Sequence, residues 1–365
     1  MIVSTQRKTT VIHAVLREEI LGGVWAVGGQ LPNEVEMARR FGCSAGTVNK
    51  AVALLVHEGL VVRKNRSGTR VISNSLTPHP RQAQLDAFAF IYPSDKHESI
   101  WRTVSGFQDA ARDAGRRILT LTTAADQRRD AELFSRLEEF DVKGAVIYPS
   151  LLTPEDYVHF TQILLKSKVP VVLTVNFPGL GFPSVVIDGF HAGYTMTRHL
   201  IGRGAKRIGH LSNGAWALHM RDRYLGYCWA LEEAGLEEPE NGVLLEAAMN
   251  PNFRDPVAEP KRIAENFLTR CGKLDAVMCA NDFLGIGLTV AARGAGLRVP
   301  EDLMVVGIDD LALSATENIS LTTYQISFEN RGHIAFHLLE DLLAEKPLKC
   351  LETRVRGQIV VRGSA

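Results

Sequence analysis

The sequence predicts an α/β protein with a small N-terminal winged helix-turn-helix head and a two-lobed body of two doubly wound parallel sheets. Three observations support this fold class. Residues 31–60 contain two short amphipathic helical patterns separated by a glycine. From residue 87 onward, short apolar runs alternate with amphipathic segments, which is typical of parallel strands covered by helices. The 365 residues exceed one ordinary compact core, so the body has room for two sheets.

The head is predicted from its capping residues. Asn33 is placed to cap a first helix, and Glu36, three residues later, completes a capping box. Gly42 supplies a turn, and Ser44 caps a second helix. The apolar positions of that second helix recur at helical spacing: Val48, Ala51, Val52 and Leu55. Two β-branched runs around residues 65–68 predict a hairpin, the wing. The remaining polar face of the second helix is available to a DNA major groove.

Charge is unevenly distributed along the chain. Residues 1–75 carry ten Lys and Arg against five Asp and Glu, although the whole chain has a formal net charge of zero. A basic head on a neutral-to-acidic body is typical of a DNA-binding protein. We therefore expect a DNA-binding domain at 1–73, a linker at 74–86 and a body at 87–365. Prolines and polar residues interrupt every periodic pattern in the linker.

Several function classes lack support in the sequence. The five cysteines form no C-x-x-C pair, which favours reduced thiols in a cytoplasmic protein. The N-terminus has no apolar signal region, and no run approaches the ~20 apolar residues of a membrane span. No metal-ligand spacing, phosphate-binding glycine loop or nucleophile elbow is present. We therefore expect a cytoplasmic protein without membrane contact, metal, cofactor or catalytic residues.

About the first seventy residues resemble the winged helix-turn-helix of the GntR family, with agreement through helix, turn, helix and wing. The family usually has Arg where this chain has Val35, Ala45 and Asn49. An Asn pairs well with adenine, where Arg favours guanine, so we expect an operator unlike the family's common sequence. The resemblance implies DNA contacts from the second helix and the wing: Ser44, Thr47, Asn49, Lys50, Arg63, Lys64, Arg66, Gly68 and Arg70.

Seven further motifs resemble, in order, the ligand-binding region of LacI-family repressors, which is itself like a periplasmic sugar-binding protein. They lie at residues 185–193, 199–210, 223–226, 275–282, 305–310, 321–323 and 360–364. A GntR-type head on a LacI-type body is the arrangement of the arabinose-repressor type of regulator. The resemblance implies a charged and amide set for ligand hydroxyls at Arg223, Asn281 and Asp309, with Trp101 as a flat ring beside the ligand. It implies further wall positions at Tyr148, Asn176, His219 and Phe328, and also at Tyr92, Asp95 and Trp216.

The resulting hypothesis is a ligand-responsive transcriptional regulator. We expect a sugar-sensing repressor that binds a palindromic operator as a homodimer and is released by its effector. Dimerisation is expected through the first lobe and through helix 330–343, placed in the second lobe. Three alternatives stay open: an effector that acts as co-repressor or activator, a solute-binding protein for transport, and an enzyme. The missing signal region and the DNA-binding pattern count against transport, and the missing catalytic motifs count against an enzyme.

Overall fold

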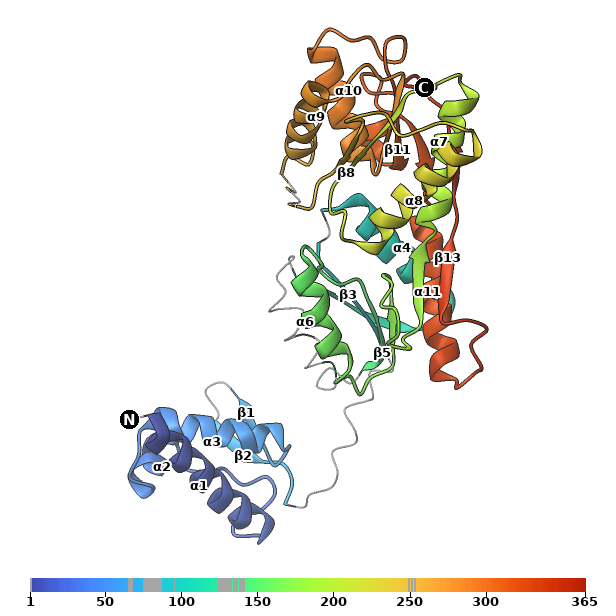
Figure 1. Cartoon of the computed structure of the whole chain (residues 1–365). Helices are drawn as coiled ribbons and strands as arrows, with labels where there is room; N and C mark the ends of the chain where they lie inside the picture. The colour runs from blue at the N-terminus through green and yellow to red at the C-terminus, as the bar shows by residue number, and fades with distance from the viewer. Residues whose placement is uncertain are drawn as a thin grey trace. The chain divides into compact units, whose positions relative to one another are not determined.

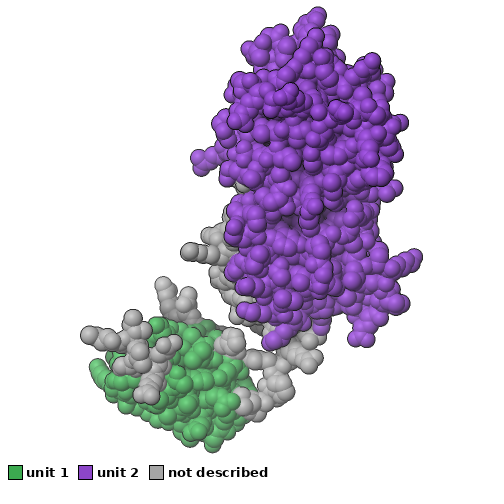
Figure 2. All heavy atoms as spheres, viewed as in Figure 1, with its two compact units in different colours: residues 1–84 green, residues 85–365 purple. Residues whose placement is uncertain are grey.

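The chain divides into two compact units, Met1–Gln84 and Leu85–Ala365 (Figure 2). The computed structural model describes residues 2–64, 68–74, 87–94, 96–123, 133, 137, 142–248, 250, 252 and 254–365. The predicted linker lies almost entirely outside these ranges, so its boundaries stay predictions. No helix among the described residues is both long and apolar enough to cross a bilayer.

The first unit is a three-helix head with a hairpin. It contains α1 (Ile2–Leu21), α2 (Glu34–Arg40), α3 (Ala45–His57), β1 (Val61–Lys64) and β2 (Gly68–Val71). The two strands pair antiparallel, as predicted. The capping box is confirmed, because the Asn33 side chain accepts from the backbone N–H of Glu36 while the Glu36 carboxylate accepts from that of Asn33. Ser44 caps α3.

Helix α1 was not predicted. Its buried residues Ile12, Leu16 and Ile20 pack against the apolar face of α3 and complete the core of the head. Their spacing of four residues places them on one side of a helix, so the pattern was present in the sequence.

The first lobe of the body is built on a six-stranded parallel sheet (Figure 1). In spatial order its strands are β13 (Glu352–Val355), β7 (Ser184–Ile187), β6 (Val171–Leu173), β5 (Val142–Ile147), β3 (Ala87–Tyr92) and β4 (Arg117–Thr122). Helices α4 (Glu98–Asp113) and α11 (Phe328–Leu343) cover one face, and α6 (Pro154–Leu164) covers the other. Helix α11 packs on β5, β6 and β7. The expectation that this helix belongs to the second lobe is therefore wrong.

The second lobe repeats this architecture. Its strands in spatial order are β14 (Gln358–Val360), β12 (Thr322–Gln325), β11 (Met304–Asp309), β10 (Ala276–Cys279), β8 (Ile208–Ser212) and β9 (Val243–Leu245). All neighbours are parallel except β14, which runs antiparallel to β12. The face covered by α7 (Gly189–Gly202) and α8 (Leu218–Glu233) is opposite to that covered by α9 (Ala258–Arg270) and α10 (Asp282–Gly294). The predicted pair of doubly wound sheets is confirmed.

Three chain crossings join the lobes. They lie between β7 and α7, between β12 and α11, and between β13 and β14. Ligands of doubly wound sheets bind outside the carboxyl ends of the strands, so the space between two lobes connected in this way is where a ligand site is expected.

Candidate functional site

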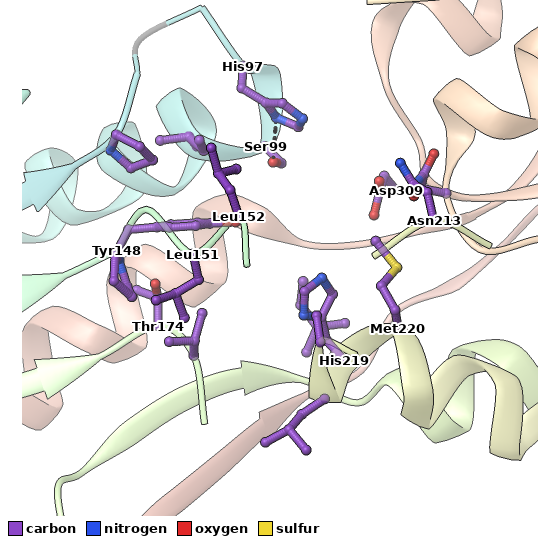
Figure 3. A pocket seen from close by; sticks show the side chains of 18 of the residues that line it. His97, Ser99, Tyr148, Leu151, Leu152, Thr174, Asn213, His219, Met220 and Asp309 are labelled. Atoms are coloured by element: carbon purple, nitrogen blue, oxygen red, sulfur yellow. Dashed lines mark hydrogen bonds between the residues drawn. The ribbon is translucent and has the colours of Figure 1, made fainter. Parts of the chain in front are cut away.

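A cavity of about 620 Å³ lies between the two lobes of the body. This volume falls in the range of small-molecule sites, about 300–1,000 Å³. Figure 3 shows its two walls: His97, Ser99, Tyr148 and Thr174 on the first lobe lie opposite Asn213, His219, Met220 and Asp309 on the second. The cavity therefore presents polar groups from both lobes to one occupant.

Arg223 is fixed in the wall formed by the second lobe. Arg223 is only 2% exposed, and its guanidinium donates to the carbonyl of Ala280 and to Oδ1 of Asp309, the latter at 3.2 Å. The backbone of Arg223 lies directly against Gly193 of α7, where a Cβ atom would collide with its carbonyl. Among the described residues, no group accepts a hydrogen bond from Nε of Arg223. One donor of a rigidly held guanidinium is therefore left for a ligand.

Asp309 is held in an unfavourable backbone conformation at the end of β11. Its φ is 136°, and φ of Asp310 is 56°, values that residues other than glycine rarely adopt and that concentrate at functional sites. Burial raises the pKa of Asp309 to about 7, although the charge on Arg223 acts in the opposite direction. Near neutral pH the carboxyl group therefore accepts a hydrogen bond when ionised and donates one when protonated.

The side chain of Asn281 forms hydrogen bonds within the protein through both its oxygen and its nitrogen. Its Oδ1 caps α10 by accepting from the N–H of Leu284 at 2.9 Å, and its Nδ2 donates to Oδ1 of Asn213 at 3.0 Å. One amide hydrogen of Asn281 remains beyond these two contacts. The predicted ligand residue thus also orders the loop that follows β10.

The first lobe contributes most of the other predicted wall residues. Tyr148, Asn176 and Phe328 line the cavity, and the Asn176 amide donates to Glu352. His219, from α8 of the second lobe, also lines it, and its recessed position and the charge on Arg223 lower the pKa of its ring. The structure thus places these residues around the same space as Arg223.

Trp101 is the ligand prediction that the structure contradicts. It is 48% exposed and is absent from the lining that the described residues form. The buried side of α4 is made by Ile100, Val104 and Phe107, so helical periodicity turns the indole towards solvent. Trp216 lines the cavity instead.

Two lesser wall predictions have different outcomes. Tyr92 is likewise absent from the lining formed by the part of the chain that the structure describes. Asp95 lies outside the described residues.

Arg331 is a lining residue that the sequence analysis missed. It lies on α11, is 2% exposed, and donates from Nε and Nη2 to the hydroxyl of Thr103 at 3.2 and 2.7 Å. An arginine inside an amphipathic helix is usually exposed. Its position three residues after Phe328, on the same side of the helix, was the available signal.

Polar contacts join the lobes at one edge of the cavity. The Glu98 carboxylate accepts from the backbone N–H of Ala312 at 2.8 Å, and Arg102 donates to the carbonyl of Asp310 at 3.2 Å. The rings of His97 and Phe283 meet edge to face, with centroids 5.6 Å apart. Helix α4 thus contacts the second lobe in this structure.

In the head, α3 presents a polar face. Ser44, Asn49 and Lys50 are exposed on it. Thr47 was expected on the same face but is only 5% exposed. Its hydroxyl lies 2.9 Å from that of Ser44 at the start of α3. A base contact by Thr47 is therefore not supported, because its side chain is buried.

Arg63 of the hairpin lies across this face. Its guanidinium donates to Oδ1 and to the backbone carbonyl of Asn49, at 3.1 and 3.2 Å, and pairs with Glu34 at 3.1 Å. Gly68 and Arg70 are exposed on the second strand of the wing. The predicted contact Arg66 and the side chain of Lys64 lie outside the described part of the chain.

Comparison with known proteins agrees with this division. Residues 8–71 match the gntR family of bacterial regulatory proteins, and residues 197–365 match a periplasmic binding protein-like domain. The chain joins a GntR-type DNA-binding domain to a periplasmic-binding-protein-like domain. An arabinose metabolism transcriptional repressor of Geobacillus stearothermophilus is 27% identical to this chain, over 98% of the chain and 99% of the relative.

Solved structures show the same body. A LacI family transcriptional regulator from Mycobacterium smegmatis is 26% identical, with a TM-score of 0.65 over 76% of this chain and 98% of that one. A complex of the transcriptional regulator CelR with cellobiose, at 22% identity, shares the fold over 92% of this chain and all of that one, with a TM-score of 0.67. The chain therefore resembles transcriptional regulators in its DNA-binding domain and in the fold of its body.

Proposed function

We propose that this regulator represses transcription as a homodimer on a roughly palindromic operator, and that a sugar or sugar derivative entering the cavity releases it. The observation that carries this proposal is the cavity itself, where fixed polar groups of two lobes surround a space large enough for a small ligand. A head with an exposed polar helix supplies the DNA-binding part.

The polar groups of the cavity suit a polyhydroxylated ligand. Each sugar hydroxyl both donates and accepts a hydrogen bond. Arg223 and Asn281 donate, and Asp309 changes role with its protonation state. The rings of Tyr148 and Trp216 are available to the C–H face of a sugar. Asn176, His219 and Phe328 complete the proposed contact set.

On DNA, α3 enters the major groove and the hairpin lies beside it. Ser44, Asn49 and Lys50 are exposed polar residues at the start and on the first turns of α3, and Arg63 extends that surface. The wing residues Lys64, Arg66, Gly68 and Arg70 belong to the same interface, as contacts to phosphates that carry no sequence information of their own. Two heads of a dimer then meet two half-sites.

Effector binding and DNA binding are coupled through the body. An effector that touches both lobes favours one relative position of the lobes over the other. A coupling of ~1–3 kcal/mol would change operator affinity about 5–150-fold. If the effector instead strengthens DNA binding, it acts as a co-repressor. This is the second candidate function.

The test is fluorescence anisotropy with labelled DNA from the region upstream of the protein's own gene, with and without a panel of pentoses, hexoses, deoxy sugars and uronic acids. We expect tight, salt-sensitive binding to one site and release by one compound, because phosphate contacts depend on counterion release. Analytical ultracentrifugation of the complex gives the stoichiometry. Binding that no compound of the panel changes, or one protomer per site, contradicts the proposal.

A further inference from the structure

The cavity contains a buried cation that has no anionic partner among the described residues. Arg331 is held in place by Thr103 and by two rings, with its guanidinium carbon 5.0 Å from the centroid of Tyr148 and 5.4 Å from that of Phe328. No ion pair of the described residues includes Arg331. Burial lowers the pKa of its guanidinium, although Tyr148 and the charge on Asp309 act in the opposite direction.

The packing around Arg331 shows that its position is built into the fold. The next residue, Gly332, lies against the backbone carbonyl of Thr103, where a Cβ atom would collide. Helices α11 and α4 therefore approach closely, and Thr103 meets the guanidinium as a consequence. Thr103 in turn donates to the carbonyl of Ser99 at 2.7 Å. The guanidinium is thus oriented before any ligand arrives.

The other buried charges of the cavity do not balance Arg331. Arg223 already pairs with Asp309, the one lining carboxylate that is buried, and burial raises the pKa of Asp309. His97 adds no negative charge; burial and the charge on Arg331 lower its pKa to about 4, which leaves it neutral at pH 7. The deep part of the cavity thus holds two guanidinium groups and one carboxyl group.

The remaining lining carboxylates lie nearer to solvent and have partners of their own. Asp222 lies 3.9 Å from Arg354, and Glu259 accepts from the Asn250 amide at 3.2 Å. Asp255 is exposed and accepts from two backbone N–H groups at the start of α9. These groups do not neutralise the buried guanidiniums.

We propose that the effector carries an acidic group, a carboxylate or a phosphate, and that Arg331 binds this group while Arg223 and Asp309 bind the hydroxyls. A planar guanidinium pairs with either oxyanion through two parallel hydrogen bonds. The proposal rests on the proposed function, since it names the chemical class of the effector for the same cavity. A neutral sugar would leave Arg331 buried against two aromatic rings without a counterion.

Matched ligand pairs provide the first test. Isothermal titration calorimetry of the full chain compares galacturonate with galactose, gluconate with glucose, and arabinose 5-phosphate with arabinose, all at one ionic strength. We expect one acidic member to bind at least tenfold more tightly than its neutral parent. The first two pairs test a sugar acid, and the third pair tests a sugar phosphate.

Two variants test the role of Arg331. Arg331→Gln should bind the acidic ligand at least tenfold more weakly than wild type does. Arg298→Gln, which removes an exposed arginine paired with Asp302 outside the cavity, should lose none. Acidic members that bind wild type no more tightly than their neutral parents, or that bind Arg331→Gln as tightly as wild type, would overturn the proposal.

A second measurement needs no ligand. If Arg331 is a buried charge that awaits its counterion, Arg331→Met should melt no lower than wild type, because an apolar side chain of similar length avoids the desolvation cost. A fall of several degrees would show that the cation stabilises the free protein and would overturn the proposal. Anisotropy of the operator complex separates the two hypotheses: an acidic ligand that binds through Arg331 without affecting DNA retention supports this inference and contradicts the proposed function.

Discussion

Arg63 of the hairpin and Asn49 of α3 form two hydrogen bonds, one to the Asn49 side chain and one to its backbone carbonyl. Asn49 is therefore both exposed on α3 and the partner that orients an arginine beside it. The polar surface of the head depends on this pair and on Glu34, which neutralises Arg63 while no DNA is bound.

Asn49 and Arg63 should recognise the operator sequence together. We expect Asn49→Ala and Arg63→Ala each to cost ~1–3 kcal/mol on the operator and to relax preference at the same base pairs. The double variant should cost less than the sum, since each residue loses its partner in either single variant. Binding measured across single-base operator variants checks this. Arg70→Ala is the control and should weaken all sequences alike; additive losses at different base pairs would contradict the prediction.

Arg223 should contribute to effector binding and not to DNA binding. Arg223→Ala is expected to lose the response to effector while operator binding stays near wild type, because removing one partner from a buried charged hydrogen bond costs ~2–5 kcal/mol. Calorimetry with the identified effector measures the loss. Arg207→Ala removes an exposed arginine paired with Asp275 and is expected to leave effector affinity unchanged. Retained wild-type affinity in Arg223→Ala would mean that the effector binds elsewhere.

The two tryptophans should differ in their response to effector. Trp216 lines the cavity and Trp101 does not, so Trp216→Phe should remove most of the effector-induced change in tryptophan fluorescence, whereas Trp101→Phe should leave it in place. Fluorescence titrations of both variants with effector, at equal protein concentration, provide the comparison. The reverse result would restore Trp101 as the ring beside the ligand.

Asp309 should make the stability of the body depend on pH. Because its folded pKa of about 7 lies above the ordinary value of 3.8, the folded state holds a proton in this window that the unfolded chain has lost. Its contribution to stability therefore falls as pH rises from about 4 to 7. Asp309→Asn does not titrate, so the free energy of unfolding of this variant should rise relative to that of wild type between about pH 4 and 7, by at most about 1.4 kcal/mol per pH unit. A difference independent of pH, measured by scanning calorimetry, would contradict this.

Gly332 should be sensitive to the smallest substitution. Gly332→Ala places a methyl group against the carbonyl of Thr103 and forces α4 and α11 apart, which we expect to cost ~1–3 kcal/mol of stability. Gly202→Ala, at the end of α7, meets no atom within 4 Å and is the matched control. Urea unfolding of the body compares them. Equal stability of the two variants would show that the helices separate without cost.

Local patterns in the sequence determined the elements of this protein. Capping by Asn33 and Ser44 acts within a few residues of the chain, so the starts of α2 and α3 could be predicted and are confirmed. The alternation of apolar runs and amphipathic segments likewise predicted two doubly wound sheets, because each strand and helix carries its own periodicity. Arg223, Asn281 and Asp309 were found through motifs that resemble a family.

Tertiary structure alone decided which side each residue faces and which lobe each helix joins. Packing of α4 on α11 and of α3 on α1 decides which side of each helix is buried, so Trp101 is exposed and Thr47 is buried. Helix α11 follows a strand of the second lobe yet packs on the first, since the chain crosses between lobes before it. For the same reason, Arg331 reaches Thr103 across 228 residues of sequence, a contact that no local pattern contains.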